Sequence, residues 1–349
     1  MTSEVRRRTG GARTGDVLAA FWAAAAAAGL TALVFTQIAP FSGPLGAVLL
    51  WYPLFLGLYA LLVWLAEPGP AVRDRVAAAF VHSLAALLLV ALVFVIAYTI
   101  GRGIPALRHL NFFTQDMTHA GPLDPVTVGG IKHGIVGTLE QIGIALLITI
   151  PLGLLCAIYL TEVPGPFARF TRTLVEAMTA LPSIVAGLFI YATVILTLGL
   201  GKSGFAAALA LSLMMLPIII RAADVVLRLI PGALKEASYA LGAGQWRTVW
   251  HVVLPTARSG LVTAFILGTA RGVGETSPVL LTAGFTATLN ASPFHDAQVS
   301  LPLLAFSLVR SGEKSYIARG FGAAAVLMGL VLLLFVLARL LGRKREGSR

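Results

Sequence analysis

The sequence is poor in charge and contains a single cysteine. Asp, Glu, Lys and Arg together make up 12% of the 349 residues, about half of the fraction that soluble domains carry. Cys156 has no second cysteine to pair with, and the six histidines are scattered without a pair at metal-ligand spacing. These absences exclude a disulfide framework and a cysteine–histidine metal cluster. Cys156 is interpreted as a small buried residue.

The sequence also lacks a nucleotide-binding motif. Residues 199–203, Gly-Leu-Gly-Lys-Ser, end like a phosphate-binding P-loop, but Leu196 stands where that motif has its first glycine. We therefore expect this chain not to be an enzyme: it should hold no ATPase site, no cofactor and no metal. Any ATP and Mg²⁺ would be bound by a separate subunit.

Long apolar runs dominate the rest of the chain. Hydrophobic residues make up 58% of it, and several uncharged stretches exceed the roughly 18 residues that indicate a membrane span. The first run is too long for the apolar part of a signal peptide. The pattern predicts an all-α integral membrane protein with eight spans, at residues 17–39, 45–66, 77–100, 134–160, 174–200, 204–223, 259–283 and 320–341.

The basic residues are distributed as membrane topology requires. The formal net charge of +11 would be compatible with nucleic acid, but the Lys and Arg residues lie in short segments between apolar runs, so we expect no nucleic-acid partner. With the N-terminus inside, cytoplasmic segments hold 17 Lys and Arg residues and outer segments hold 7. The positive-inside rule therefore predicts that both termini are cytoplasmic.

Three regions follow from this topology. Residues 1–70 begin with a basic segment (Arg6, Arg7, Arg8 and Arg13) and form a two-span appendage that ends in Glu-Pro-Gly-Pro. Residues 71–341 hold the other six spans, and residues 342–349 form a basic cytoplasmic tail. The polar outer loop 101–133 is long enough to cover part of the outer mouth.

The cytoplasmic segment 231–258 carries the most specific pattern. Pro231 and Gly232 end the preceding helix, a short helix follows from about 233 to 241, and Gly242 ends it. A second amphipathic piece is predicted from the i, i+3, i+4, i+7 spacing of Trp246, Val249, Trp250 and Val253. Periodicity alone fits two interpretations equally: a helix that docks into a partner's groove, or a helix that lies on lipid.

The spacing in this segment resembles the EAA loop of ABC importer permeases. The matching residues are Glu236, Ala237, Ser238, Gly242, Ala243, Trp246, Leu254 and Pro255. Ser238 stands where the family usually has a second alanine. The resemblance implies that the segment forms coupling helices that dock on a cytoplasmic ATPase.

Other segments narrow the resemblance. Residues 129–162 resemble the start of phosphate importer permeases, and residues 181–189, Leu-Pro-Ser-Ile-Val-Ala-Gly-Leu-Phe, resemble their next span. Residues 271–284 resemble the A-type subunit (the PstA family) more than its C-type companion. The likeness covers about residues 75–341, and it implies a type I ABC importer fold with a six-span permease core.

The resemblance also implies partners. They would be a PstC-like second permease, a PstB-like ATPase dimer and a PstS-like extracytoplasmic phosphate-binding protein, in the bacterial inner membrane. Two alternatives stay open: a permease for another oxyanion or a phosphonate, and, less favoured, an ion-coupled secondary transporter.

Arg271 and Glu275 are charged residues inside the predicted apolar span 259–283. A charge at a helix centre costs about 2.5–3.5 kcal/mol on insertion scales and usually faces a cavity. The two residues lie four apart, so they can pair on one helix face. Gly268 and Gly272 have the spacing at which a second helix approaches closely.

Two functions are open for this pair. It is either a structural link between helices, or a cation, Arg271, beside an anion pathway; in the second case Glu275 pairs with Arg271 at rest and gives it up to a passing anion. Arg221 is a weaker candidate for the inner exit, because an anchor at the membrane surface explains it equally well. Glu140 and Gln141 are interpreted as polar contacts between helices.

Overall fold

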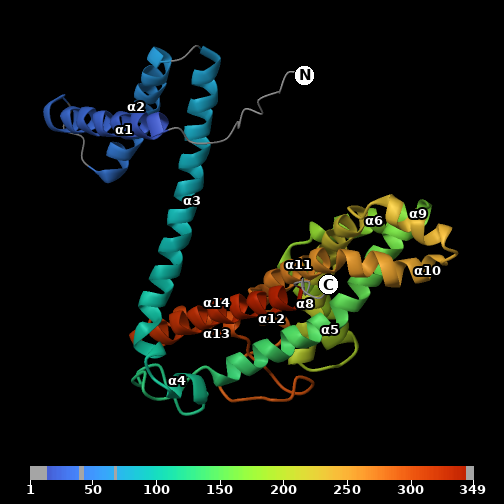
Figure 1. Ribbon diagram of the computed structural model, residues 1–349. Coiled ribbons are helices and arrows are strands. Elements are labelled where there is room, and N and C mark those ends of the chain that lie inside the picture. The colour runs from blue at the N-terminus through green and yellow to red at the C-terminus, as the bar shows by residue number, and fades with distance from the viewer. Residues whose placement is uncertain (1–13, 39–42, 67–68, 343–349) are drawn as a thin grey trace. The chain divides into compact units, whose positions relative to one another are not determined.

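The computed structural model describes residues 14–38, 43–66 and 69–342, and the regular elements in these ranges are all helices (Figure 1). The predicted all-α fold is therefore confirmed for this part of the chain. The basic segment with Arg6, Arg7, Arg8 and Arg13, the residues Glu67 and Pro68, and the tail 343–349 lie outside the described residues.

The chain divides into two compact units, Met1–Val95 and Ile96–Arg349. In the first unit, α1 (Thr14–Leu33) continues into a π-helical turn η1 (Val34–Ile38), followed by α2 (Pro44–Ala66) and the first part of α3 (Gly69–Leu107). Ala23, Tyr59 and Val63 form its small core. The predicted domain boundary at residue 70 remains a prediction, because α3 runs unbroken from one unit into the other.

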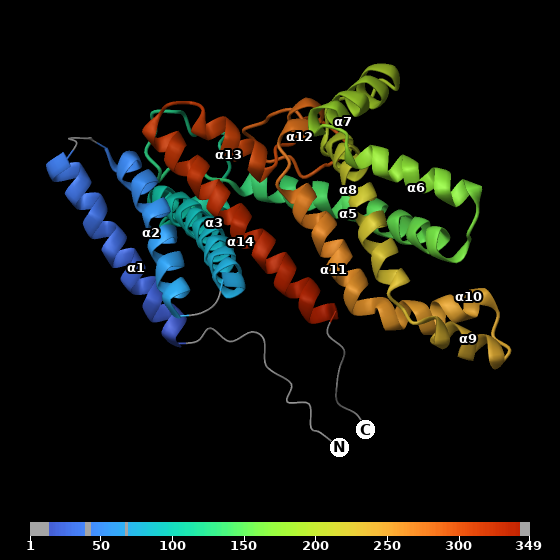
Figure 2. The same ribbon diagram turned by 90° about the horizontal axis from the view of Figure 1, so that it is seen from above.

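The second unit contains the remaining elements (Figure 2). They are α4 (Asn111–Thr114), α5 (Lys132–Glu162), α6 (Pro166–Thr179), α7 (Ser183–Ile190), η2 (Tyr191–Thr197), α8 (Gly204–Arg228), α9 (Gly232–Ala240), α10 (Gln245–Thr248), η3 (Val249–Val253), α11 (Leu254–Val273), α12 (Ser277–Thr282), α13 (Leu301–Val309) and α14 (Lys314–Gly342).

Seven described helices are long and apolar enough to cross a membrane, and one bent helix pair makes an eighth candidate. These correspond to the eight predicted spans, with two corrections. The fifth is not continuous: α6 and the helix that starts at Ser183 meet at 104°, because Pro182 lacks an N–H and disfavours helical geometry at Leu181. The seventh ends at Val273, and α12 is separate, since Pro278 begins a new helix.

The centre of the second unit is held by close packing of α8 against α5 and α11. A methyl group added at Gly268 would overlap Ile219, and one added at Gly272 would overlap Met215. One added at Gly153 of α5 would lie 2.7 Å from Ile219. The close helix approach predicted from Gly268 and Gly272 is therefore confirmed, and its partner is α8.

The segment between α3 and α5 is anchored on α14 by one arginine. Arg319 is fully buried and donates hydrogen bonds to the backbone carbonyls of Pro125 at 2.7 Å and Val128 at 2.6 Å. Its guanidinium also lies 5.6 Å from the ring of Tyr316. The carbonyl oxygens satisfy a buried charge that a carboxylate would otherwise have to balance.

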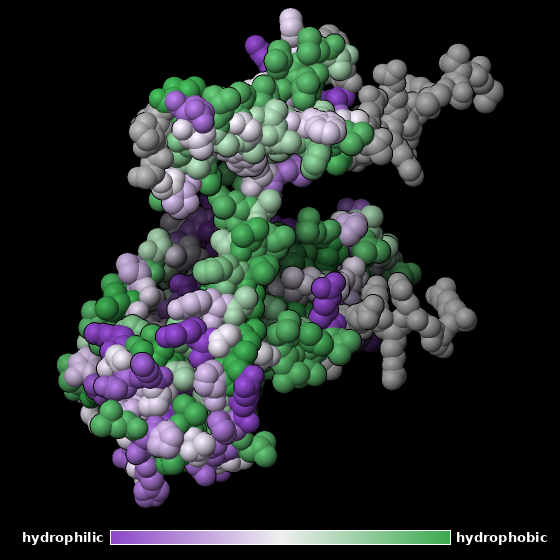
Figure 3. Space-filling model, turned by 90° about the vertical axis from the view of Figure 1, so that its left-hand side faces the viewer, coloured by the Kyte–Doolittle hydropathy of each residue, from purple (hydrophilic) through white to green (hydrophobic). Residues whose placement is uncertain are grey.

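Apolar side chains cover much of the surface of the helices. In the most apolar window of α3 no residue is buried, and Leu88 is 73% exposed. Figure 3 shows this apolar surface, with polar side chains gathered at its lower end, where α4 lies in Figure 1. Such exposure in a helical protein indicates contact with lipid.

Candidate functional site

Arg271 and Glu275 form an ion pair where α11 ends. Their burial differs sharply: the side chain of Arg271 is 52% exposed and that of Glu275 is 6% exposed. The sequence suggested that Arg271 lies at a helix centre. It lies instead in the last turn of α11, where the partial negative charge of the helix C-terminus stabilises a cation.

The exposed end of this pair faces a small cavity of about 50 Å³ between α6, α7, α8 and α11. Arg271 is the charged member of a lining that otherwise holds uncharged residues: Met178, Thr179, Leu181, Ala186, Leu213, Met214 and Ile218. Glu275 also lines a second, smaller pocket, together with Thr138, Gln141 and Ser300. Among the described residues of the first lining, Arg271 is the one positive charge, and an anion in the cavity would compete with Glu275 for its guanidinium.

Arg221 is exposed on α8 and is not among the residues that line the Arg271 cavity. The structure therefore does not bring these two predicted residues into one site. Asp224 and Arg228, which share the helical register of Arg221, do interact: Arg228 Nε donates to Asp224 Oδ1 at 3.0 Å. Arg172 of α6 approaches the same oxygen at 3.6 Å.

The predicted coupling segment forms a compact two-helix loop. Helix α9 matches the predicted 233–241 within a residue at each end, and Gly242 follows it with φ +81°, a conformation that favours glycine. Ser238 on α9 hydrogen-bonds Thr248 on α10 at 2.8 Å, so the residue that departs from the EAA pattern joins the two arms.

The loop is also tied to the end of α5. Lys235 Nζ donates to Glu162 Oε1 at 2.5 Å, and Gln245 Nε2 donates to the Glu162 carbonyl oxygen at 3.0 Å. The outer face of the loop is exposed and includes Glu236, Ala237 and Leu241, the last with 90% of its surface exposed. Leu254 and Pro255 begin α11.

The prediction of one amphipathic helix face that holds Trp246, Val249, Trp250 and Val253 is wrong. The two valines are 1% exposed, whereas Trp246 is 65% and Trp250 57% exposed. The reason is the π-helical turn η3, whose wider turn separates the tryptophans from the valines. The valines pack inward with Leu227, and the tryptophans stay available for lipid or a partner.

A buried polar network links α5 to the segment before α13, and the sequence showed only part of it. Gln141 Nε2 donates to the Gln298 carbonyl at 3.0 Å, and Gln298 Nε2 donates to Glu140 Oε2 at 2.5 Å. Glu140 and Gln141 make polar contacts, as predicted, but their partner Gln298 lies in the segment before α13 and not in a second helix. The sequence did not indicate Gln298 as the partner, because it lies 157 positions away from Gln141 along the chain.

Comparison with known proteins places this geometry in context. Residues 149–347 match the family model described as "Binding-protein-dependent transport system inner membrane component". A relative from Mycobacterium tuberculosis (strain CDC 1551 / Oshkosh), the phosphate transport system permease protein PstA 1, is 40% identical over 74% of this chain and 85% of its own length.

Similar relatives occur in other bacteria. The phosphate transport system permease protein PstA of Haemophilus influenzae is 34% identical over 69% of this chain and 83% of its own length. Among solved structures, a chain of the inward-facing MetNI methionine ABC transporter is 23% identical, with a TM-score of 0.43, and covers 61% of this chain and 91% of its own.

Proposed function

Since the chain belongs to the family of binding-protein-dependent transport system inner membrane components, we propose that it is the permease subunit of an ATP-driven importer of inorganic phosphate. The observation that carries the substrate assignment is the half-exposed Arg271 in an otherwise uncharged cavity. The names of the relatives from M. tuberculosis and H. influenzae support the same substrate. A permease for another oxyanion or a phosphonate is the alternative.

In this proposal the chain forms half of a translocation pore and breaks no bond itself. A PstC-like permease supplies the other half, a PstB-like ATPase dimer binds ATP and Mg²⁺ beneath it, and a PstS-like protein delivers phosphate from outside. Both termini are cytoplasmic, as the Lys and Arg distribution predicts.

The packing of the loop suggests how ATPase closure reaches the pore. Val249 and Val253 lie in one buried cluster with Leu227 of α8 and Leu261 of α11. Motion of the docked loop is therefore transmitted into both helices. From Leu254 to Arg271, α11 rises about 25 Å at 1.5 Å per residue. A tilt of this rigid helix changes the exposure of Arg271, and nucleotide drives it only through different affinities for the two states.

The experiment is uptake of labelled phosphate at micromolar concentration in cells that lack this chain and in cells that regain it, with sulfate, molybdate and a phosphonate as competitors. We expect restored uptake that only unlabelled phosphate blocks, and its loss in Arg271→Ala at normal protein level. Restored uptake that another oxyanion blocks would support the alternative substrate. Normal uptake by a stably assembled Arg271→Ala variant would refute the role of this residue.

A further inference from the structure

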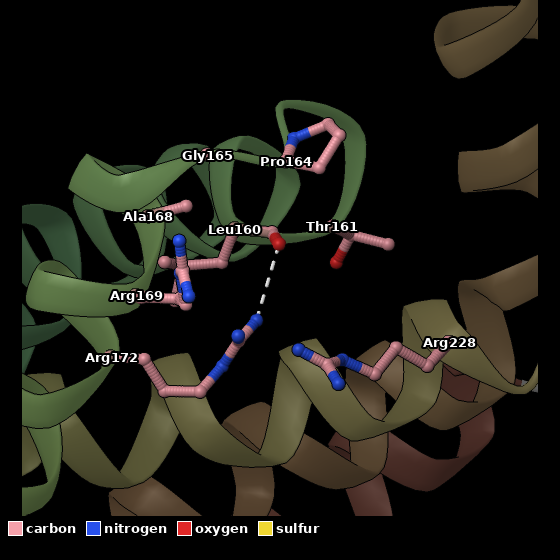
Figure 4. Close-up of a pocket in the computed structure, with 8 residues that line it drawn as sticks. All are labelled: Leu160, Thr161, Pro164, Gly165, Ala168, Arg169, Arg172 and Arg228. Carbon is pink, nitrogen blue, oxygen red and sulfur yellow. Dashed lines mark hydrogen bonds between the residues drawn. The ribbon is translucent and has the colours of Figure 1, made fainter.

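A second basic site lies at the other end of the second unit, next to the coupling loop. A pocket of about 550 Å³ is lined by the end of α5, the turn that follows it, the first two turns of α6 and the end of α8. Its lining residues are Leu160, Thr161, Pro164, Gly165, Ala168, Arg169, Arg172 and Arg228 (Figure 4). Its volume is within the range of small-ligand sites.

Two of the three arginines of this pocket, Arg172 and Arg228, are held by one carboxylate. Asp224 Oδ1 accepts from Arg228 Nε at 3.0 Å and from Thr161 Oγ1 at 3.2 Å, and it lies 3.6 Å from Arg172 Nη2. Arg172 Nη2 also donates to the Leu160 carbonyl at 3.2 Å. In Figure 4 the guanidinium groups of Arg172 and Arg228 point toward each other.

Positive charge remains after this pairing. Two guanidinium groups, those of Arg172 and Arg228, share the carboxylate of Asp224, which is 13% exposed and is not among the residues that line the pocket. Arg172 Nε is buried without a hydrogen-bond partner. The guanidinium of Arg169 is exposed and has no polar partner among the described residues. Glu162, at the end of α5, is paired with Lys235.

Guanidinium forks match the oxygens of phosphate and carboxylate groups, and several arginines together favour the group with the larger charge, which is phosphate. We propose that this pocket binds a phosphate group, held by Arg169, Arg172 and Arg228. Two sources have this chemistry: the headgroup of an anionic lipid, and free inorganic phosphate on the side of the membrane that holds the coupling loop.

The surroundings of the pocket suit both sources. Phe167 and Phe170 of α6 are 66% and 63% exposed and extend an apolar strip beside the arginines, along which acyl chains can lie. The pocket is otherwise open to solvent at Arg228, which is 49% exposed. Thr161 directly precedes Glu162, which holds the coupling loop, so a bound anion would stabilise the base of that loop.

Thermal unfolding of the purified full-length chain in a neutral detergent tests this proposal. The probes are inorganic phosphate and dioctanoyl-phosphatidylglycerol, with dioctanoyl-phosphatidylcholine as the uncharged comparison. We expect at least one anionic probe to raise the midpoint. In Arg169→Gln/Arg228→Gln the half-effective concentration should rise about tenfold or more, since each charged hydrogen bond contributes roughly one power of ten. Arg73→Gln, an exposed arginine outside the pocket, is the matched control.

The possible outcomes distinguish a lipid headgroup from free phosphate, and this pocket from the Arg271 cavity. A response to the lipid alone identifies a headgroup, and a response to phosphate alone identifies the free anion. No response to either probe, or the same concentration dependence in the double variant, overturns the proposal. Arg271→Ala should keep the rise in the unfolding midpoint, because Arg271 does not line this pocket. If Arg271→Ala loses that rise and the double variant keeps it, the proposal is overturned. If the double variant does not fold, Arg169→Gln alone serves, since its side chain supports no described contact.

Discussion

The packing of α11 against α8 makes a quantitative prediction about Gly268. A methyl group at this position would lie 2.9 Å from Ile219 Cδ1 and closer still to Cγ1, and Ile219 is fully buried. Overpacking of this kind costs about 1–3 kcal/mol. We therefore expect Gly268→Ala to lower the free energy of unfolding by about 2 kcal/mol, although alanine is the better helix former.

The matched control is Gly143→Ala on α5, where an added methyl group would meet nothing within 4 Å. It should be neutral or slightly stabilising, because only helix propensity changes. The assay is thermal or denaturant unfolding of the full-length chain in one detergent, followed by tryptophan fluorescence.

A double-mutant cycle with Ile219→Ala assigns the effect to this contact. Ile219→Ala alone leaves a cavity that costs about 2–5 kcal/mol, and a methyl group at Gly268 should then be tolerated. We expect a coupling energy of about 1–3 kcal/mol that favours the double variant. Equal stability of Gly268→Ala and Gly143→Ala, or simple additivity in the cycle, would refute the proposed packing of α11 on α8.

Three further predictions concern the coupling loop and the segment between α3 and α5. Gly242→Asp should reduce copurification with the ATPase at least tenfold, because φ +81° disfavours a residue with a Cβ; unchanged copurification would contradict the docking role of this loop. Burial alone would raise the pKa of Asp116, but hydrogen bonds from the Thr118 and Leu289 backbone N–H groups lower it below its usual value. The stability from this lowered pKa is present above the usual aspartate pKa near 4 and is lost as pH falls through the lower native value. The protection factor for hydrogen exchange at the Leu289 amide, which is the intrinsic rate at each pH divided by the observed rate, should therefore fall on acidification below about pH 4. Asp116→Asn should remove that dependence, and the same fall in the variant would count against it. Arg319→Met should cost about 3 kcal/mol by removing the two charged hydrogen bonds to Pro125 and Val128, and an unfolding midpoint equal to that of the native chain would rule this out.

The coupling loop shows which structural features a local sequence pattern can predict and which it cannot. Pro231, Gly232 and Gly242 marked the bounds of α9 because proline and glycine restrict or release backbone angles whatever surrounds them. The same reasoning failed at Trp246 and Val249, because the i, i+3, i+4 rule assumes an α-helix. The π-helical turn there depends on how the valines pack against α8.

The sequence by itself determined the fold class, the positions of seven helices that can span a membrane and the closeness of one helix contact. Length and apolarity decide what crosses a membrane, and glycines at positions 268 and 272 permit close approach whichever helix arrives. Only the tertiary structure decided that this helix is α8, that α11 ends beside Arg271, and that Arg172 and Arg228 share Asp224. These facts depend on residues far apart in the chain, and the energy that selects their contacts exists only once the helices are packed together.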